Sequence, residues 1–115
     1  MYALNFYSDL YGEVLRNGRK TATVRLGDKT DKYKPGMLVW ITVGPRFGVR
    51  RKLFTAILDR VEVKKLEDLS PRDIERESPE SRSLDDILAT MTRIYGDLIT
   101  PHHTVTVIYF SRVEE

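Results

Sequence analysis

The nine residues from Asn17 to Arg25 hold a dense group of reactive and charged side chains. They contain three cations, two threonine hydroxyls and one glycine. Gly18 lets the backbone turn tightly, and cationic side chains donate hydrogen bonds to phosphates or to the edge of a base. The segment therefore predicts a site for an anion or a nucleotide. Its candidate binding residues are Arg19, Lys20, Thr21, Thr23 and Arg25.

A purely structural role for the same segment stays open. Asn17-Gly18 is typical of the end of a helix, because Gly adopts the left-handed conformation that helix ends need. Basic residues just beyond a helix also interact favourably with the negative end of its dipole. In this interpretation the polar face of the following strand is simply solvated.

A second basic segment, from Arg46 to Lys52, places four cations around one aromatic residue. Such a loop can follow a phosphate backbone while the aromatic ring stacks on a base. The alternative is a solvated hairpin whose phenylalanine packs on the end of the fold. The candidate contacts in this segment are Arg46, Phe47, Arg50 and Arg51.

The elements that position these segments follow from the hydrophobic pattern. Helical spacing of apolar residues predicts a helix over 7–15, with Ser8 as its N-cap. Ser70-Pro71 and Ser83 begin two further helices, and the second of these ends at Gly96. Alternation predicts strands over 1–6, 20–25, 37–43, 52–63 and 104–110, the fourth of them bent near Asp59.

The order of these elements is strand, helix, three strands, two helices and strand. The helices are too few to cross over every strand pair of a parallel sheet. We therefore expect one domain, residues 1–115, of the α+β class: a small, mostly antiparallel β-barrel flanked by about three helices. One core is expected, with Leu88 and Met91 packing a helix against it. Its strand residues are Ala22, Val24, Val39, Ile41, Leu53 or Phe54, Val105 and Val107.

Composition limits the class of protein. The absence of cysteine excludes disulfides, a thiolate nucleophile and zinc sites that use sulfur. The first ten residues lack the features of a signal peptide, and no apolar run approaches the ~18 residues of a membrane span, so a cytoplasmic protein with no membrane partner is expected. No metal or cofactor is expected, because the adjacent His102 and His103 point opposite ways on an extended segment. Few Asn residues and no Gln favour a heat-adapted source.

Charge is unevenly distributed along the chain. Residues 1–65 carry 14 basic and 6 acidic side chains, whereas residues 66–115 carry 5 basic and 11 acidic ones. This asymmetry favours one face that binds an anion such as RNA. The alternative is that the two halves attract each other within the fold.

The run Gly18-Arg19-Lys20-Thr21, followed by Thr23 and Arg25, resembles the signature of the ASCH family, whose fold is similar to the PUA domain. The order of the predicted elements agrees along nearly the whole chain. The resemblance implies a PUA-like β-barrel with a cleft. It also implies that the ligand is RNA or a modified cytidine nucleoside.

Some members of the ASCH family remove the acetyl group from N4-acetylcytidine with a Lys, a Thr and a Glu. The resemblance assigns these roles to Lys20 as base, Thr23 as nucleophile and Glu77 as acid, with Glu75 as a substitute for Glu77. A threonine hydroxyl needs such a base, and a lysine serves as one only when its pKa is lowered by burial or by nearby cations. Three functions stay open: a binding module, an amidohydrolase, and a ribonuclease that relies on Lys and Arg. The oligomeric state is not indicated.

Overall fold

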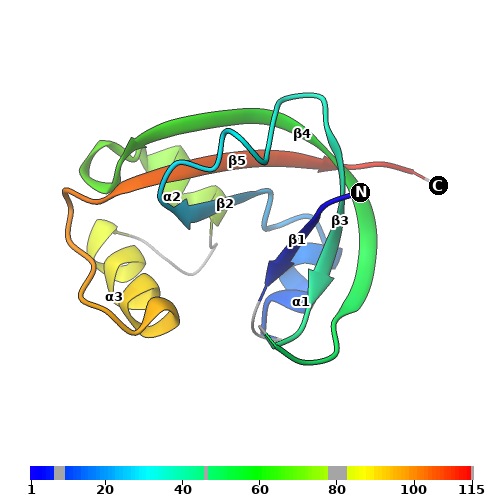
Figure 1. Cartoon of the computed structure of the whole chain (residues 1–115), viewed down its shortest axis with the longest axis horizontal. Coiled ribbons are helices and arrows are strands. Elements are labelled where there is room, and N and C mark those ends of the chain that lie inside the picture. Colours follow the sequence, from blue (N-terminus) through cyan, green and yellow to red (C-terminus); the bar gives the residue numbers. More distant parts are fainter. Residues whose placement is uncertain (7–9, 46, 78–82, 115) are drawn as a thin grey trace.

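A single curled sheet dominates the computed structural model, which describes residues 1–6, 10–45, 47–77 and 83–114. Its strands are β1 (Ala3–Phe6), β2 (Ala22–Leu26), β3 (Leu38–Val43), β4 (Arg51–Lys65) and β5 (Thr104–Arg112). They lie in the order β1-β3-β4-β5-β2, so β1 and β2 form the two edges. Among the described strands, β1 and β3 pair in parallel and the other three pairs are antiparallel. The sheet bends into a half-barrel (Figure 1), which confirms the expected α+β, PUA-like class.

Three α-helices flank the sheet within the described ranges (Figure 1). They are α1 (Leu10–Arg16), α2 (Pro71–Glu77) and α3 (Leu84–Tyr95), and a short 3-10 helix, η1 (Leu66–Asp68), follows β4. The predicted first helix began at Tyr7 with Ser8 as its cap, and both residues lie outside the described ranges. In the part of the chain that the structure describes, no helix is both long and apolar enough to cross a membrane.

The predicted helix boundaries are confirmed where local side-chain chemistry sets them. Ser70 and Asp73 exchange hydrogen bonds at the start of α2: the Asp73 amide donates to the Ser70 hydroxyl and the Ser70 amide to the Asp73 carboxylate. The Ser83 side chain accepts from the Asp86 amide at the start of α3. Gly18 and Gly96 have φ of 78° and 77°, the left-handed conformation expected at helix ends.

The structure confirms one prediction from the alternating pattern and shifts the start of another strand. The bend expected near Asp59 is confirmed as a register shift in the pairing of β4 with β5, between Leu58 and Arg60. The strand predicted to begin at Lys20 begins instead at Ala22. The two residues before it complete the turn after α1, where the Lys20 amide donates to the Val14 carbonyl at 2.9 Å.

The prediction of one core is wrong, because the buried side chains of the described residues form two clusters. One cluster contains Val39, Ile41 and Phe54, and the other contains Ala22, Val24, Val105 and Val107 together with Met91 and Leu88 of α3. Successive residues of β5 point to opposite faces of the sheet. Ile108 and Phe110 therefore enter the first cluster, whereas Val107 and Tyr109 enter the second.

A candidate ligand pocket beside a buried ion pair

Lys20 is buried, with 1% of its surface exposed, although it follows an exposed turn. Its Nζ lies 3.0 Å from Oε1 of Glu77 and donates to the Ala22 carbonyl at 2.9 Å. Nζ also donates to the backbone carbonyl of Glu77. Three acceptors around one amine match the three donors of a charged ammonium group. The fold thus brings together two residues that are 57 positions apart.

Burial lowers the pKa of Lys20, whereas the charge and hydrogen bond of Glu77 raise it and Arg25 adds a smaller lowering effect. The Nζ atom lies 5.3 Å and 5.2 Å from the ring centroids of Phe6 and Tyr11, within the range of a cation–π contact. Burial, followed by the charge of Glu77, raises the pKa of Tyr11. The ammonium group of Lys20 is therefore shielded from water by these aromatic rings and by Glu77.

Glu77 reaches Lys20 because α2 is fixed at both ends. At its start, Asp73 binds Ser70 and also accepts from Lys64 at 2.9 Å and from the Tyr109 hydroxyl at 2.5 Å. At its end, Oε2 of Glu77 accepts from the Val24 amide at 2.6 Å. Both carboxylate oxygens of Glu77 are therefore engaged. The proposed substitute, Glu75, is exposed and does not line the pocket described below.

Thr23 and Arg25 lie on β2 beside this ion pair. Nε of Arg25 donates to the Thr23 hydroxyl at 3.0 Å, and Nη1 donates to the Asn5 carbonyl at 3.0 Å. The guanidinium also lies 4.9 Å from the centroid of the Phe6 ring. Among the described residues, Nη2 of Arg25 has no acceptor, so it is available to a ligand.

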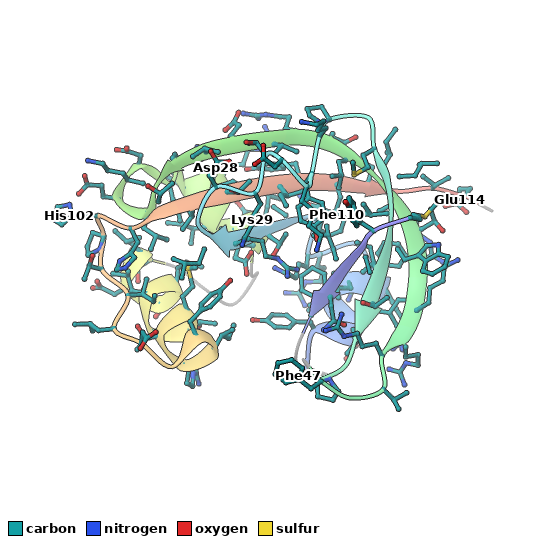
Figure 2. The ribbon with its side chains drawn as sticks, viewed as in Figure 1. Asp28, Lys29, Phe47, His102, Phe110 and Glu114 are labelled. Atoms are coloured by element: carbon teal, nitrogen blue, oxygen red, sulfur yellow. The ribbon has the colours of Figure 1, made fainter. Side chains whose placement is uncertain are left out.

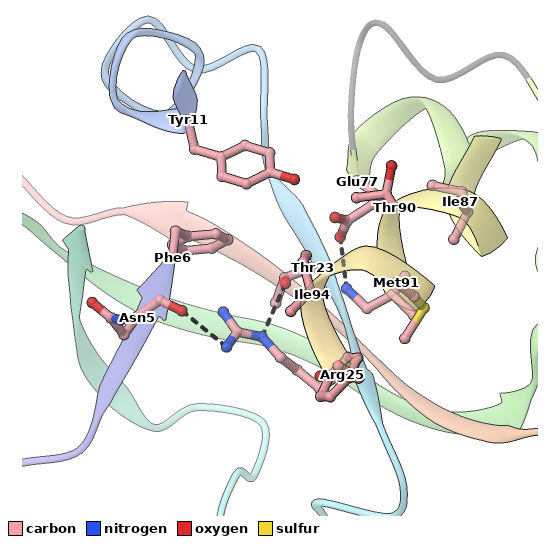
Figure 3. Close-up of a pocket in the computed structure, with 12 residues that line it drawn as sticks. Asn5, Phe6, Tyr11, Thr23, Arg25, Glu77, Ile87, Thr90, Met91 and Ile94 are labelled. Carbon is pink, nitrogen blue, oxygen red and sulfur yellow. Dashed lines mark hydrogen bonds between the residues drawn. The ribbon is translucent and has the colours of Figure 1, made fainter. Parts of the chain in front are cut away.

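A pocket of about 50 Å³ that is partly open to solvent adjoins these groups. Phe6 and Tyr11 enter it from one side, Glu77, Thr90 and Met91 enter from the other, and Thr23 and Arg25 lie between them (Figure 3). Its lining residues are Asn5, Phe6, Tyr11, Thr23, Val24, Arg25, Glu77, Ile87, Thr90, Met91, Ile94 and Tyr95.

The aromatic and α3 residues of this pocket were not predicted as site residues. Tyr11 and Tyr95 look like ordinary members of amphipathic helices in the sequence, and nothing in the helical period separates a pocket wall from a core. In the structure, Ile94 is 43% exposed although it belongs to the apolar face of α3. This exposure is a weak sign that the helix borders a pocket. The Tyr95 hydroxyl accepts from the Leu26 amide at 3.2 Å, which ties α3 to β2.

The remaining predicted residues lie outside this pocket. Thr21 precedes β2 and lines a second cavity, whereas Thr23 lies on β2 and lines the candidate pocket. Arg19 is exposed on the turn after α1. Phe47, Arg50 and Arg51 are exposed on the hairpin between β3 and β4, and Arg46 lies outside the described ranges.

The hairpin nevertheless begins next to the pocket. The Gly44 amide donates to the Phe6 carbonyl at 3.0 Å, and the Asn5 side chain donates to the Gly44 carbonyl at 2.9 Å. A Cβ on Gly44 would lie 2.5 Å from the Val49 carbonyl oxygen, so glycine allows the two arms of the hairpin to approach closely. Phe47 is 92% exposed at the tip of this hairpin (Figure 2).

Comparison with known proteins concerns the fold of the chain. No family model and no curated protein matches the sequence. The crystal structure of an ASCH domain from Lactobacillus crispatus aligns with a TM-score of 0.69 and 12% identity, covering 94% of this chain and 77% of that one. The fold is that of an ASCH domain. The resemblance carried by Gly18 to Arg25 is thus confirmed at the level of fold.

Two other solved structures support the same ASCH-like fold. Protein EF3133 from Enterococcus faecalis, of the family DUF984, aligns with a TM-score of 0.69 and 17% identity over 98% of this chain and 80% of that one. The hypothetical protein PH0355 aligns with a TM-score of 0.68 and 18% identity over 97% of this chain and 98% of that one. The roles expected for Lys20, Thr23 and Glu77 stay predictions, since a likeness at these identities concerns the fold.

Proposed function

We propose that this ASCH-like domain binds a modified cytidine nucleoside, free or within RNA, in the pocket between β1, β2 and α3. The observation that carries the proposal is the fixed position of Arg25. Its guanidinium is held by Thr23 and Asn5, which leaves further donors for the edge of a base. A donor that is already ordered loses little entropy when a ligand binds.

Aromatic rings beside Arg25 support a nucleobase rather than a simple anion. The rings of Phe6 and Tyr11 lie 5.9 Å apart at an interplanar angle of 60° and line the same side of the pocket. Single bases are recognised by stacking on such rings and by hydrogen bonds to their edges. The enclosed part of the pocket suits part of one heteroaromatic ring, with the ribose outside in solvent.

Calorimetric titration with cytidine, N4-acetylcytidine and uridine tests this proposal. We expect Arg25→Ala to weaken binding at least tenfold, because it removes the ordered donor. Arg60→Ala is a matched control, since Arg60 is exposed on β4 and pairs with Glu62 away from the pocket. If none of the three nucleosides binds, or if the control loses as much affinity, the proposal is wrong.

The Lys20–Glu77 contact favours a second candidate, an amidohydrolase that acts on N4-acetylcytidine. The reaction would begin with a proton shift from Lys20 to Glu77 within the pair. Neutral Lys20 would then take the proton of Thr23 as Thr23 attacks the acetyl carbonyl, and protonated Glu77 would return a proton to the leaving amine. Water would then hydrolyse the acetyl ester on Thr23 and release acetate. Burial supports this role because it moves the pKa of Lys20 toward the neutral amine that a base needs.

Incubation with N4-acetylcytidine, followed by chromatography for cytidine and acetate, separates the two candidates. Turnover that disappears in Thr23→Val supports the enzyme. Binding of the same nucleoside without any turnover supports the binding module alone.

A further inference from the structure

A second cavity of about 380 Å³ lies between the end of α1, α2 and strands β4 and β5. Its lining includes four arginines from three separate elements: Arg16 on α1, Arg72 and Arg76 on α2, and Arg112 on β5. It is distinct from the nucleoside pocket, although one ion pair links them, because Glu77 lines the first and Lys20 lines the second.

The charge of this arginine cavity is largely uncompensated. Among the described residues, none of the four arginines has a carboxylate oxygen within 4.0 Å. Asp59 is the acidic residue in the lining, and its carboxylate already accepts from the Ser111 hydroxyl at 2.5 Å. The charge of Lys20 is matched by Glu77. In the described lining, the four arginine charges therefore face the one negative charge of Asp59.

Such an arrangement selects for phosphate. The planar guanidinium group donates two parallel hydrogen bonds to a phosphate, and several guanidinium groups can share one phosphate or bind neighbouring ones. Three of these arginines are exposed and one is partly buried, so an anion can reach them, and a bound anion relieves the repulsion between neighbouring positive charges. We propose that the arginine cavity binds phosphate groups, supplied either by the backbone of an RNA strand or by a nucleoside polyphosphate. This site does not depend on the proposed nucleoside pocket.

Fluorescence anisotropy with a labelled oligouridylate over a salt series tests the RNA source. Arg72→Gln combined with Arg76→Gln should weaken binding at least tenfold at low salt. It should also reduce the slope of log affinity against log salt by about 1.4, or about 0.7 for each phosphate that the variant no longer neutralises. Lys29→Gln combined with Lys65→Gln removes the same charge from exposed positions outside both cavities, so this control should lose much less affinity.

A second pair of substitutions tests whether the loss of affinity comes from local unfolding of α2, which carries both Arg72 and Arg76. Arg16→Gln with Arg112→Gln removes the two arginines on the other elements and should weaken binding to the same extent. Circular dichroism and thermal unfolding check that each variant is folded. If both arginine pairs bind the oligonucleotide as the wild type does, or if the lysine control loses as much affinity, the RNA source is wrong.

Calorimetric titration with inorganic tripolyphosphate tests the other source. If tripolyphosphate binds, the arginine substitutions abolish that binding and RNA does not bind, the site is one for a free polyphosphate. If neither RNA nor tripolyphosphate binds at low salt, the proposal is overturned. Titration with cytidine, which has no phosphate, reports only on the first pocket, so failure of one site is distinguishable from failure of the other.

Discussion

The guanidinium of Arg25 donates a 3.0 Å hydrogen bond to the backbone carbonyl of Asn5 and so links β2 to β1. These strands are the two edges of the sheet and do not pair through their backbones. A side chain therefore bridges the half-barrel at the place where the backbone leaves it open (Figure 3). The bridge also forms part of the candidate pocket, which ties ligand binding to the shape of the fold.

Arg25→Lys should weaken nucleoside binding at least tenfold, although it keeps the positive charge. A lysine is a single flexible point donor and cannot reproduce the fixed fork that holds both Thr23 and Asn5. The free energy of unfolding should also fall, by about 1.5–3 kcal/mol, the range for a hydrogen bond to a charged group. Calorimetry and urea unfolding measure the two effects. Affinity equal to that of the wild type would show that charge alone is sufficient.

Lys20→Met should lower the free energy of unfolding by about 3–5 kcal/mol, because it leaves the Glu77 carboxylate, 13% exposed, without its partner. Lys20→Met combined with Glu77→Gln should cost less than the sum of the single changes. Urea unfolding of the four proteins measures this coupling as a double-mutant cycle. Strictly additive effects would mean that the two side chains do not depend on each other.

Thr23→Ser and Thr23→Val separate catalysis from binding. If Thr23 is a nucleophile, serine should keep measurable turnover of N4-acetylcytidine and valine should abolish it. If Thr23 only orients Arg25 through its 3.0 Å contact, valine should weaken nucleoside binding by about 1 kcal/mol. Turnover and affinity are measured on the same two variants. Equal turnover in valine and serine variants would exclude the nucleophile.

Phe47→Ala should weaken binding of single-stranded RNA by about 1–3 kcal/mol if the exposed ring stacks on a base. Arg50→Ala with Arg51→Ala should instead flatten the salt dependence of the same binding, because phosphate contacts release counterions. Neither change should affect a free nucleoside, since none of the three residues lines the pocket. RNA affinity and salt slope that match the wild type would leave the hairpin without a role in binding.

We expect the free energy of unfolding to fall at alkaline pH, because Tyr109 ionises there. Burial, followed by the hydrogen bond to Asp73 and the charge of Asp73, raises the pKa of its hydroxyl from 10.0 to about 12. The fold favours the neutral phenol, so this contribution is complete below about pH 10 and disappears as pH rises toward about 12. Tyr109→Phe should remove that dependence. Urea unfolding of both proteins at several alkaline pH values measures it, and an equal decline in both would contradict the assignment.

The sequence by itself determined the elements and most of their boundaries. Ser70 and Asp73, or Ser83 and Gly96, act within one or two helical turns, so a linear pattern contains all that their caps require. The bend in β4 and the placement of the Gly18 turn before β2 are local in the same sense. Together with the motif that follows Gly18, these features are sufficient to predict the ASCH-like fold.

The family resemblance grouped Lys20, Thr23 and Glu77 in one set, but only the tertiary structure shows which side chains touch. The Glu77–Lys20 contact joins residues 57 positions apart, and it requires the anchoring of α2 by Lys64 and Tyr109 as well as the turn after α1. Long-range pairing of this kind depends on the sum of many packing interactions, which no local pattern records. The same reason explains why the two separate cores and the arginine cavity could not be predicted. Their residues come from helices and strands whose faces become neighbours only when the sheet curls.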